Sequence, residues 1–456
     1  MNKVVGRARI MLVLIIVLAG GMLLFVGEYF ARAGEWVMFP GSPHIYSAGN
    51  IGCGMVTDRE GYLLLDMTGG RLYPDNQLLK RSTVHWLGDR NGSISAPAVS
   101  HYASKVAGFN VFDGVYSYGG TGGQVQLTLS AKIQMAAAEA LGDYHGTVAV
   151  YNYKSGELIC AVSGPNFDPD DPPDISNDTE EIYKGLYVNR FTQSKYTPGS
   201  IFKIVTAAAA LEHIPDIMER TLECTGERAY GIDVVTCPRA HGTMTLKEAF
   251  GNSCNCAFAQ LADMLGGSVL ERYVKDFGVL DSISFDGIST AAGSIEAAAA
   301  APVQVAWSAI GQHKDLVNPC AYLNFVGAIA ADGLGVQTQL VSRVTVGDTV
   351  TYQMDSGNSK RIMSTKTAQT MKEIMRSAVE YNYGGVHYFG SLPVCAKTGT
   401  AEVGDNQLPT ATFAGFVDDA DLPLAFIAIA ENAGAGSTVC IPIIAEILEA
   451  CVDEMK

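Results

Sequence analysis

The longest run of hydrophobic residues lies near the N-terminus. Residues 10–27, IMLVLIIVLAGGMLLFVG, contain no charged side chain, and Lys3, Arg7 and Arg9 precede them. A helix of this length is about the shortest that crosses a hydrocarbon core of about 30 Å. Basic residues before such a run favour a cytoplasmic N-terminus. The pattern therefore predicts a cytoplasmic tail at 1–9, a single transmembrane anchor at 10–27, and an extracytoplasmic remainder held at the plasma membrane.

Two other interpretations of this run stay open. Residues 31–33 (ARA) resemble the cleavage site of a signal peptide, but the run exceeds the roughly 7–15 apolar residues usual in such signals. A buried core helix is the other alternative, and it does not account for the basic flank. We therefore expect an anchor that is not cleaved.

Short alternations of apolar and polar residues follow the anchor. They predict two strands joined by a turn over 56–67 and another strand within 82–93. A Gly-rich linker at 119–123 comes next. These features indicate a β-rich pedestal domain over 28–123.

From residue 124 onward, strand patterns frame a long region of Ala-rich helical patterns. Ser130 is suited to cap the first of these helices. The strands, hairpin and helices expected at the two ends of the region cover 124–129, 131–141, 146–163, 392–402, 410–418, 422–432 and 442–455. This order predicts an α+β fold over 124–456, with helices packed on an antiparallel sheet.

Composition narrows the function. The formal net charge of −16 over 456 residues argues against nucleic-acid binding, which needs clustered Lys and Arg. The ten Cys and eight His form no CxxC or HExxH pattern. We therefore expect no structural metal and no cofactor.

The first candidate motif is SIFK at 200–203, directly after a Pro-Gly pair. That pair predicts a helix that begins at Ser200, and residues three apart share one helix face. A serine hydroxyl needs a base to become a nucleophile, and Lys203 can act only when its amine is neutral. Burial and a second nearby cation would lower its pKa toward that state. The motif predicts Ser200 as nucleophile and Lys203 as base, although four residues alone recur by chance.

The second candidate motif is SCN at 253–255, between two helical patterns. Ser253 Oγ can relay a proton between Lys203 and a leaving amine, and Asn255 can hold Lys203 and bond a substrate amide. Taken alone, the motif favours a helix N-cap, for which Ser and Asn are both suited.

The third candidate motif is KTGT at 397–400, which ends a strand pattern. Lys397 would supply the second cation and anchor a carboxylate, and Thr398 and Thr400 would bond that carboxylate from one side of the strand. Gly399 would let a substrate backbone approach. The backbone amides of Ser200 and Thr400 would form an oxyanion hole. The alternative is an ordinary strand followed by a turn.

Together, and in this order, the three motifs are the signature of β-lactamases and penicillin-binding proteins. The chain resembles a class B penicillin-binding protein over nearly its whole length. Stretches outside the motifs that support the resemblance are 56–65, 185–212, 224–266 and 310–312. The resemblance implies a penicillin-binding, β-lactamase-like transpeptidase domain at 124–456 above an N-terminal pedestal.

The resemblance also implies a serine D,D-transpeptidase of peptidoglycan. Ser200 would attack the D-Ala-D-Ala end of a stem peptide, release D-Ala, and pass the acyl group to a neighbouring amine. β-Lactams would acylate the same serine. A membrane glycosyltransferase of the elongation or division machinery would be the protein partner. Nothing in the residues separates an elongation role from division or sporulation.

Three positions depart from the family pattern. Ala396 stands where the family usually has Gly, residues 412–413 (TF) replace a frequent Trp, and Ser130 replaces a usual Asp. These changes affect the expected β-lactam affinity and substrate preference, but not the reaction class.

Cysteines near the motifs raise two questions. Cys254 lies inside the second motif, and a buried apolar role is favoured over a second nucleophile because no His is near in sequence. Cys224 and Cys237 flank a polar loop, and a disulfide between them is as expected as two free thiols.

Three other functions are alternatives to a transpeptidase: a β-lactamase, a D,D-carboxypeptidase and a non-catalytic scaffold. A β-lactamase needs a group that directs water to the acyl-enzyme, and no Glu suited to that role is identified. A D,D-carboxypeptidase differs only in its acceptor. A non-catalytic scaffold of the wall machinery would not need three intact motifs.

Overall fold

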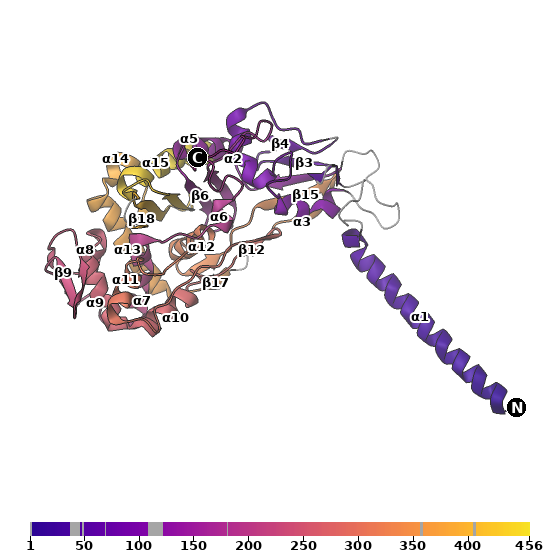
Figure 1. Ribbon diagram of the computed structural model, residues 1–456, viewed down its shortest axis with the longest axis horizontal. Coiled ribbons are helices and arrows are strands. Elements are labelled where there is room, and N and C mark those ends of the chain that lie inside the picture. The colour runs from indigo at the N-terminus through magenta and orange to yellow at the C-terminus, as the bar shows by residue number, and fades with distance from the viewer. Residues whose placement is uncertain are drawn as a thin grey trace.

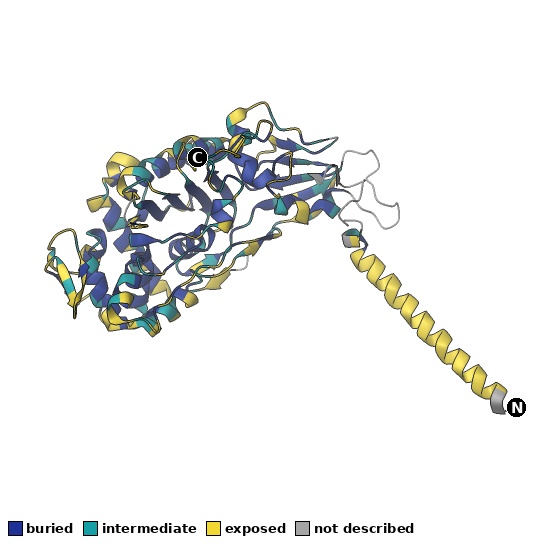
Figure 2. Cartoon of the chain, in the orientation of Figure 1, coloured by how far each residue is buried: buried dark blue, intermediate teal, exposed yellow. Residues whose placement is uncertain are grey.

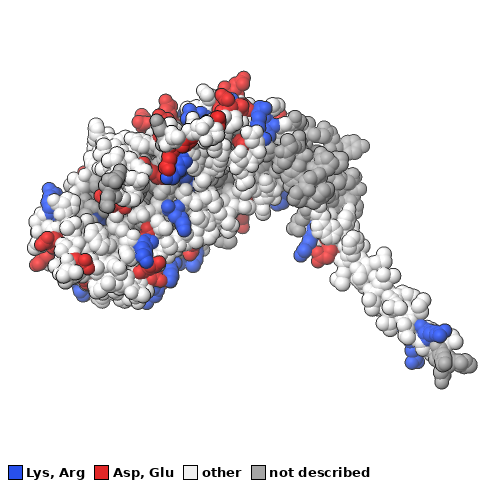
Figure 3. All heavy atoms as spheres, in the orientation of Figure 1, with Lys and Arg blue, Asp and Glu red and all other residues white. Residues whose placement is uncertain are grey.

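The computed structural model describes residues 2–36, 46–47, 50–68, 70–107, 122–179, 181–355, 359–404 and 407–456. Helix α1 (Asn2–Trp36) projects away from the body (Figure 1). The most apolar 18 residues within its stretch Val4–Gly34 have a mean hydropathy of 2.9, and none of these 18 residues is buried. Charged side chains gather at the two ends of the helix (Figure 3). The predicted anchor at 10–27 lies inside this helix, which is long and apolar enough to cross a membrane.

The core of the body is a five-stranded antiparallel sheet in the order β18-β19-β20-β6-β7. Its strands are β18 (Val394–Ala401), β19 (Thr410–Val417), β20 (Leu424–Ala430), β6 (Gly146–Asn152) and β7 (Leu158–Gly164). Helices α5 (Ala131–Leu141) and α15 (Gly436–Met455) pack on one face, and α12 (Pro319–Ala330) packs on the other. Because both faces are covered, the strands are buried almost throughout (Figure 2). The predicted α+β fold is confirmed.

A helical region fills the space beside the free edge of β18. Its helices are α6 (Arg190–Gln193), η1 (Gly199–Phe202), α7 (Lys203–His213), α8 (Leu246–Gly251), α9 (Asn255–Leu265), α10 (Gly267–Asp276), α11 (Pro302–Ala309), α13 (Thr365–Asn382) and α14 (Gly385–Phe389). The first eight residues of α7 are all buried. Its run of alanines explains this, because small side chains let neighbouring elements approach from every side.

Short strands connect these helices. They are β8 (Leu222–Cys224), β9 (Glu227–Tyr230), β10 (Asp233–Thr236), β11 (Gly242–Met244), β12 (Ser284–Phe285), β13 (Ile288–Ser289), β14 (Leu334–Val336) and β17 (Ser359–Arg361). β8 pairs with β11 and β9 with β10. These two pairs lie next to the second motif in the chain.

The pedestal contains a second five-stranded sheet in the order β16-β15-β5-β3-β4. Its strands are β3 (Met55–Thr57), β4 (Leu63–Asp66), β5 (Gln124–Leu127), β15 (Val341–Val346) and β16 (Thr349–Gln353), and a small pair, β1 (Tyr46–Ser47) and β2 (Asn50–Ile51), precedes them. β5 pairs in parallel with β3 and antiparallel with β15. The predicted boundary between residues 123 and 124 therefore cuts through a continuous sheet.

The strand predicted within 82–93 is wrong. The first half of those residues, 82–87, belongs to helix α2 (Gln77–Leu87), which Asn76 caps by accepting a hydrogen bond from the Leu79 amide at 3.0 Å. Trp86 Nε1 donates to the Ala161 carbonyl at 2.7 Å, so packing against the main sheet overrides the strand preference of the local residues. Two short helices, α3 (Pro97–His101) and α4 (Ala103–Val106), follow. Most of the predicted linker at 119–123 lies outside the described residues.

Helix boundaries elsewhere follow the predicted pattern closely. Ser130 caps α5 as expected, accepting from the Ile133 amide at 3.1 Å. The last helix begins at Gly436 rather than at 442, and Pro442 lies inside it. Pro442 removes one helical hydrogen bond in the second turn, and the apolar residues buried on both sides of it keep the helix continuous.

Asp58 joins the pedestal sheet to the start of α5. Its Oδ1 accepts from the Glu60 amide at 2.9 Å and the Tyr62 amide at 2.7 Å, and its Oδ2 accepts from the Ala131 amide at 3.0 Å. The side chain is 3% exposed. A carboxylate at a helix N-terminus also interacts favourably with the helix dipole. One buried side chain thus fixes a β-turn and a helix of two different regions.

We expect Asp58→Ala to lower the free energy of unfolding by about 2 kcal/mol, because it leaves several amides without an acceptor. The midpoint of urea unfolding measures this. Asp58→Asn keeps the size of the side chain and one oxygen, so its loss should be smaller. A wild-type midpoint for Asp58→Ala would contradict the proposed link.

Candidate active site

The structure brings together all five predicted catalytic side chains. Ser200 lies in η1, Lys203 is the first residue of α7, and Lys397 lies on β18. Ser253 lies in the turn between α8 and α9, and Asn255 is the first residue of α9. Three separate regions of the chain therefore meet at the free edge of the main sheet.

Lys203 is the hub of the hydrogen bonds. Its Nζ lies 3.0 Å from Ser200 Oγ and 3.1 Å from Ser253 Oγ. The same nitrogen donates to the Ser253 carbonyl at 2.7 Å and to Asn255 Oδ1 at 2.8 Å. The predicted contact between Ser200 and Lys203 is present, but the α-helix predicted to begin at Ser200 begins later. The first turn is a 3₁₀ helix, and the α-helix begins only at Lys203.

Lys397 approaches the same group of atoms from β18. Its Nζ donates to Ser253 Oγ at 3.0 Å and to the Thr398 carbonyl at 2.9 Å. Ser253 Oγ therefore connects the two lysine amines. This is the position that a proton relay between them requires.

Both amines are removed from water. Lys203 and Lys397 are 0% exposed. The ring centroid of Phe258 lies 5.6 Å from Lys203 Nζ, and those of Phe250 and Tyr383 lie 5.8 and 5.6 Å from Lys397 Nζ. Such apolar rings exclude solvent, and desolvation disfavours a charged amine.

The pKa values follow from this environment. Burial, and then the charge of Lys397, hold the pKa of Lys203 well below its usual range. Burial lowers the pKa of Lys397 to about 7. Sequence reasoning anticipated both causes for Lys203, but it could not show that burial is the larger.

The hydrogen bonds show how a neutral Lys203 would act. The Ser253 carbonyl and Asn255 Oδ1 can only accept, so they take the two hydrogens of a neutral amine. The nitrogen lone pair is then left for the hydroxyl groups. In that state Ser200 Oγ donates its proton to Lys203, which is the geometry of a general base.

The backbone around Ser200 is held from two sides. The Gly199 amide donates to the Gly311 carbonyl at 3.0 Å, and buried Tyr322 Oη donates to the Ile201 carbonyl at 2.7 Å. Gly199 has φ +58°, and a Cβ there would lie 2.8 Å from the Thr400 carbonyl oxygen. Only glycine lets η1 approach β18 this closely. Ser200 and Thr400 backbones are thereby neighbours.

Gly399 of the third motif has a structural role that was not predicted. A Cβ on Gly399 would lie 3.0 Å from the Ile201 nitrogen and 3.1 Å from the Pro198 carbonyl, and it would also collide with Thr412 Oγ1. Gly399 therefore makes room for η1 and β19, in addition to any room it leaves for substrate. Thr400 is exposed and Thr398 is half-buried, so both are placed to meet a ligand.

The second motif is not an N-cap formed by its polar residues. Cys254 caps α9, with its Sγ accepting from the Ala257 amide at 3.4 Å. Ser253 adopts φ +50°, which is unusual for a residue with a side chain, and such positions cluster at functional sites. Asn255 Nδ2 donates to the Thr236 carbonyl at 2.9 Å, which leaves its second N–H for a substrate.

Sequence reasoning missed the groups that enclose the two amines. Phe250 and Phe258 occupy the buried faces of α8 and α9, where their helical spacing was the only signal. Tyr383 and Tyr322 carried no signal, because nothing local ties them to the motifs. Thr412 was noted as a departure, and its Oγ1 donates to the Pro198 carbonyl at 3.1 Å, beside Ser200.

Of the two alternatives for Cys224 and Cys237, the structure has two free thiols rather than a disulfide. Each sulfur instead lies near His241, with Cys224 Sγ 3.5 Å and Cys237 Sγ 3.4 Å from its Nδ1. Cys254 is fully buried, which agrees with the favoured interpretation that it is not a second nucleophile.

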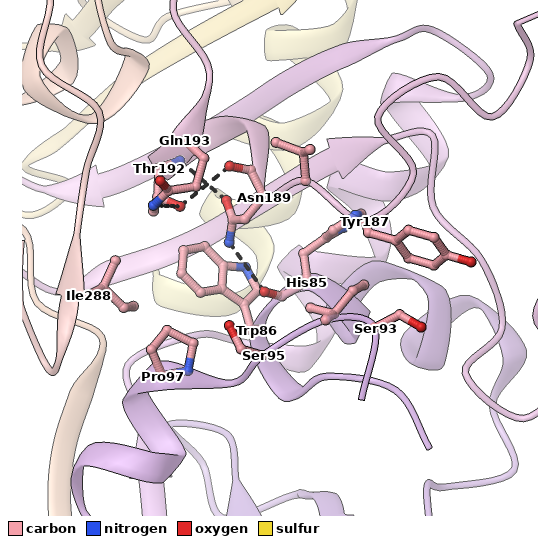
Figure 4. Close-up of a pocket in the computed structure, with 12 residues that line it drawn as sticks. His85, Trp86, Ser93, Ser95, Pro97, Tyr187, Asn189, Thr192, Gln193 and Ile288 are labelled. Atoms are coloured by element: carbon pink, nitrogen blue, oxygen red, sulfur yellow. Dashed lines mark hydrogen bonds between the residues drawn. The ribbon is translucent and has the colours of Figure 1, made fainter. Parts of the chain in front are cut away.

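A separate pocket of about 250 Å³ lies between α2, the segment around α6, and β13 (Figure 4). Trp86 and Ile288 line it, and Asn189 Nδ2 donates to the His85 carbonyl at 3.3 Å. No residue of the three motifs lines this pocket. Burial lowers the pKa of His85 to about 4, so the lining carries no positive charge at neutral pH. It does not offer a cation for a carboxylate.

Comparisons with known proteins identify the family of the chain. Residues 146–449 match the family model described as the penicillin binding protein transpeptidase domain. The chain is 28% identical over 351 residues to the peptidoglycan D,D-transpeptidase PbpA of Mycolicibacterium smegmatis, covering 69% of this chain and 68% of that protein. It is 30% identical over 362 residues to stage V sporulation protein D of Bacillus subtilis, covering 73% of this chain. It spans about half (54%) of that relative's length.

A solved structure shares the fold. Penicillin-binding protein A from M. tuberculosis, in its penicillin G acyl-enzyme complex, superposes with a TM-score of 0.71 at 22% identity. The match covers 88% of this chain and 99% of that one. At this identity the likeness supports the fold alone.

The Lys397 charge should set the pH range in which Ser200 reacts. In Lys397→Met that charge is absent, so the pKa of Lys203 rises and its neutral form needs a higher pH. We expect the acid limb of the rate of fluorescent penicillin labelling to move to higher pH. Lys314→Met, at an exposed lysine, is the control and should leave the limb in place. An unmoved limb in Lys397→Met would contradict the assignment.

Proposed function

The chain belongs to the penicillin-binding protein transpeptidase family, as the class B resemblance predicted, and we infer that it cross-links peptidoglycan stem peptides through an acyl-enzyme on Ser200. The observation that carries this inference is the position of Lys203 Nζ, within 3.1 Å of both the Ser200 and Ser253 hydroxyls. A single buried amine can thus take a proton from the nucleophile and pass one toward the leaving group.

The first half of the reaction forms the acyl-enzyme. Ser200 Oγ attacks the carbonyl carbon of the penultimate D-Ala, and its proton moves to Lys203. The backbone amides of Ser200 and Thr400 hold the negative oxygen of the tetrahedral intermediate. The intermediate collapses, the peptide bond breaks, and Ser253 delivers a proton to the departing D-Ala nitrogen. The proximity of the two backbones, which Gly199 makes possible, supports this placement.

The second half reverses these proton movements. An amine from a neighbouring stem peptide attacks the ester carbonyl and gives its proton back through Ser253 and Lys203. The C–O bond to Ser200 breaks, and the hydroxyl is restored. The new peptide bond is the cross-link, so no external oxidant or energy source is needed.

Substrate binding uses the edge of the main sheet. β18 is an edge strand, so its backbone can pair with an extended peptide. Lys397, Thr398 and Thr400 would bind the terminal carboxylate, and Asn255 would bond a peptide amide with its free N–H. β-Lactams would occupy the same groove and acylate Ser200, and membership of the penicillin-binding protein transpeptidase family supports this proposal.

We place the catalytic domain outside the cytoplasm, held by α1 as a single-pass anchor. The basic residues before the apolar run support this orientation. Cross-linking acts on glycan strands that a glycosyltransferase makes, and residues 146–449 are occupied by the transpeptidase domain. A membrane glycosyltransferase of the elongation or division machinery is the proposed partner.

A β-lactamase and a D,D-carboxypeptidase would both transfer the acyl group from the serine to water, whereas a transpeptidase transfers it to an amine. Among the described residues, no carboxylate hydrogen-bonds to Ser200, Lys203 or Ser253, so no acidic group there directs water to the ester. A β-lactamase would need such a group. A D,D-carboxypeptidase would use the same residues and transfer to water.

A donor peptide ending in D-Ala-D-Ala and a separate amine acceptor test the proposal. We expect cross-linked product and released D-Ala from the wild-type chain, and a loss of at least about 1,000-fold in Ser200→Ala. Ser268→Ala, at an exposed serine of α10, is the control. D-Ala release without cross-linked product would identify a carboxypeptidase. Rapid turnover of nitrocefin would identify a β-lactamase, and either outcome would overturn the proposal.

A further inference from the structure

Four side chains that commonly bind metals converge next to the second motif. Cys224, Cys237, His241 and Cys254 each offer one ligand atom, and these four atoms all lie within 4.8 Å of one another. Cys224 and Cys254 are buried, and the other two are half-buried. None of these groups takes part in the proposed reaction.

The four residues come from separate segments that the local fold brings together. Cys224 ends β8, which pairs with β11 so that Cys224 faces Gly242, the residue after His241. Cys237 follows β10, and its amide donates to the Gly226 carbonyl at 2.9 Å. Cys254 arrives from the turn before α9. The spacing is C-x₁₂-C-x₃-H-x₁₂-C, which contains no CxxC.

The distances fit a tetrahedral ion. Cys237 Sγ lies 3.9 Å from Cys254 Sγ and 3.4 Å from His241 Nδ1, and Cys224 Sγ lies 3.5 Å from the same nitrogen. Zinc bonds of about 2.3 Å to sulfur and 2.0–2.1 Å to nitrogen place two sulfurs about 3.8 Å apart, and a sulfur and a nitrogen about 3.5 Å apart. The side chains therefore need little rearrangement to bind an ion at their centre.

We propose that these four residues form a structural Zn²⁺ site. Three thiolates and one imidazole select zinc over harder cations such as Mg²⁺ and Ca²⁺. Four protein ligands complete the tetrahedron and leave no position for a reactive water, which is the pattern of a structural site. The expectation of no metal rested on local spacing alone, and the ligands here are collected from three segments, since Cys237 and His241 share the connection between β10 and β11.

The segment of β9 and β10 buries few apolar residues, so a bound metal would help to order it. β9 and β10 lie at the periphery of the body, and their side chains are mostly exposed (Figures 1 and 2). Of their eight residues only Val235 is buried. A segment with so little apolar cover gains much of its order from cross-links, and metal binding can supply the folding energy.

The site would also position catalytic groups. Cys254 lies between Ser253 and Asn255, both of which bond to Lys203 Nζ. Asn255 in turn donates to the Thr236 carbonyl, one residue before Cys237. Zinc bound to Cys237 and Cys254 would tie β10 to the second motif and hold the Ser253 and Asn255 side chains in place. This part of the proposal rests on the proposed function, whereas zinc binding itself does not.

The alternative to metal binding is a disulfide between two of these three cysteines. A bond between Cys224 and Cys237, or between Cys237 and Cys254, would use two sulfurs and leave His241 and the third thiol without a shared role. All three sulfurs and the nitrogen lie within 4.8 Å of one another, which favours an ion, because a disulfide needs only one close pair.

Zinc content of the full-length chain, purified in detergent without chelator, tests the proposal. We expect about one zinc per chain in the wild type and in Cys53→Ser, whose cysteine lies in the pedestal, and loss of zinc in Cys237→Ser and His241→Asn. Replacement by Co²⁺ should give the absorption of a tetrahedral thiolate complex. A wild-type chain without zinc, whether its thiols are free or its intact mass is two hydrogens lower, would overturn the site.

A second measurement covers variants that fail to fold. Stripping zinc from the wild type with a chelator should lower its thermal midpoint and slow fluorescent penicillin labelling about tenfold or more, and added zinc should restore both. Ser200→Ala should bind zinc normally while losing the label, so failure of the metal site and failure of the proposed function are distinguishable. Unchanged labelling after stripping would contradict the positioning role.

Discussion

Two lysine amines buried side by side are the constraint on which the active site depends. Lys203 and Lys397 are both 0% exposed, and one hydroxyl, Ser253 Oγ, lies 3.1 and 3.0 Å from their nitrogens. Two charges cannot be held so close together, away from water, without a large free-energy penalty. The protein relieves it by lowering the pKa of both amines, which leaves Lys203 able to stay neutral and accept the serine proton near neutral pH.

Much of the surrounding structure can be understood as holding that arrangement. The rings of Phe250, Phe258 and Tyr383 keep water from the amines. Glycines at 199 and 399 let η1 approach β18, so that the Thr400 backbone lies beside Ser200. The left-handed turn at Ser253 aims both its carbonyl and its hydroxyl at the same nitrogen. The proposed zinc site would fix this turn from its far side.

Local patterns predicted what local forces decide. The helix over 131–141 and its cap at Ser130 follow from propensity and one side-chain hydrogen bond, and the strands of the main sheet follow from nearly continuous apolar runs. The motifs predicted the five catalytic side chains, because helix, turn and strand each constrain their neighbours. Long-range packing was not predictable in this way. Helix α2 was mistaken for a strand, β5 joins the pedestal sheet, and the Cys and His residues meet only after β8 and β11 pair.

The central claim is that Ser200 is the residue that becomes acylated, and peptide mapping tests it most directly. After reaction with penicillin, trypsin should release the peptide of residues 196–203, because Lys195 and Lys203 flank its sequence. The account predicts that mass spectrometry finds one penicilloyl group per chain, on this peptide, with fragment ions that place it at Ser200. An adduct on Ser253 or Cys254, or none at all, would contradict the account.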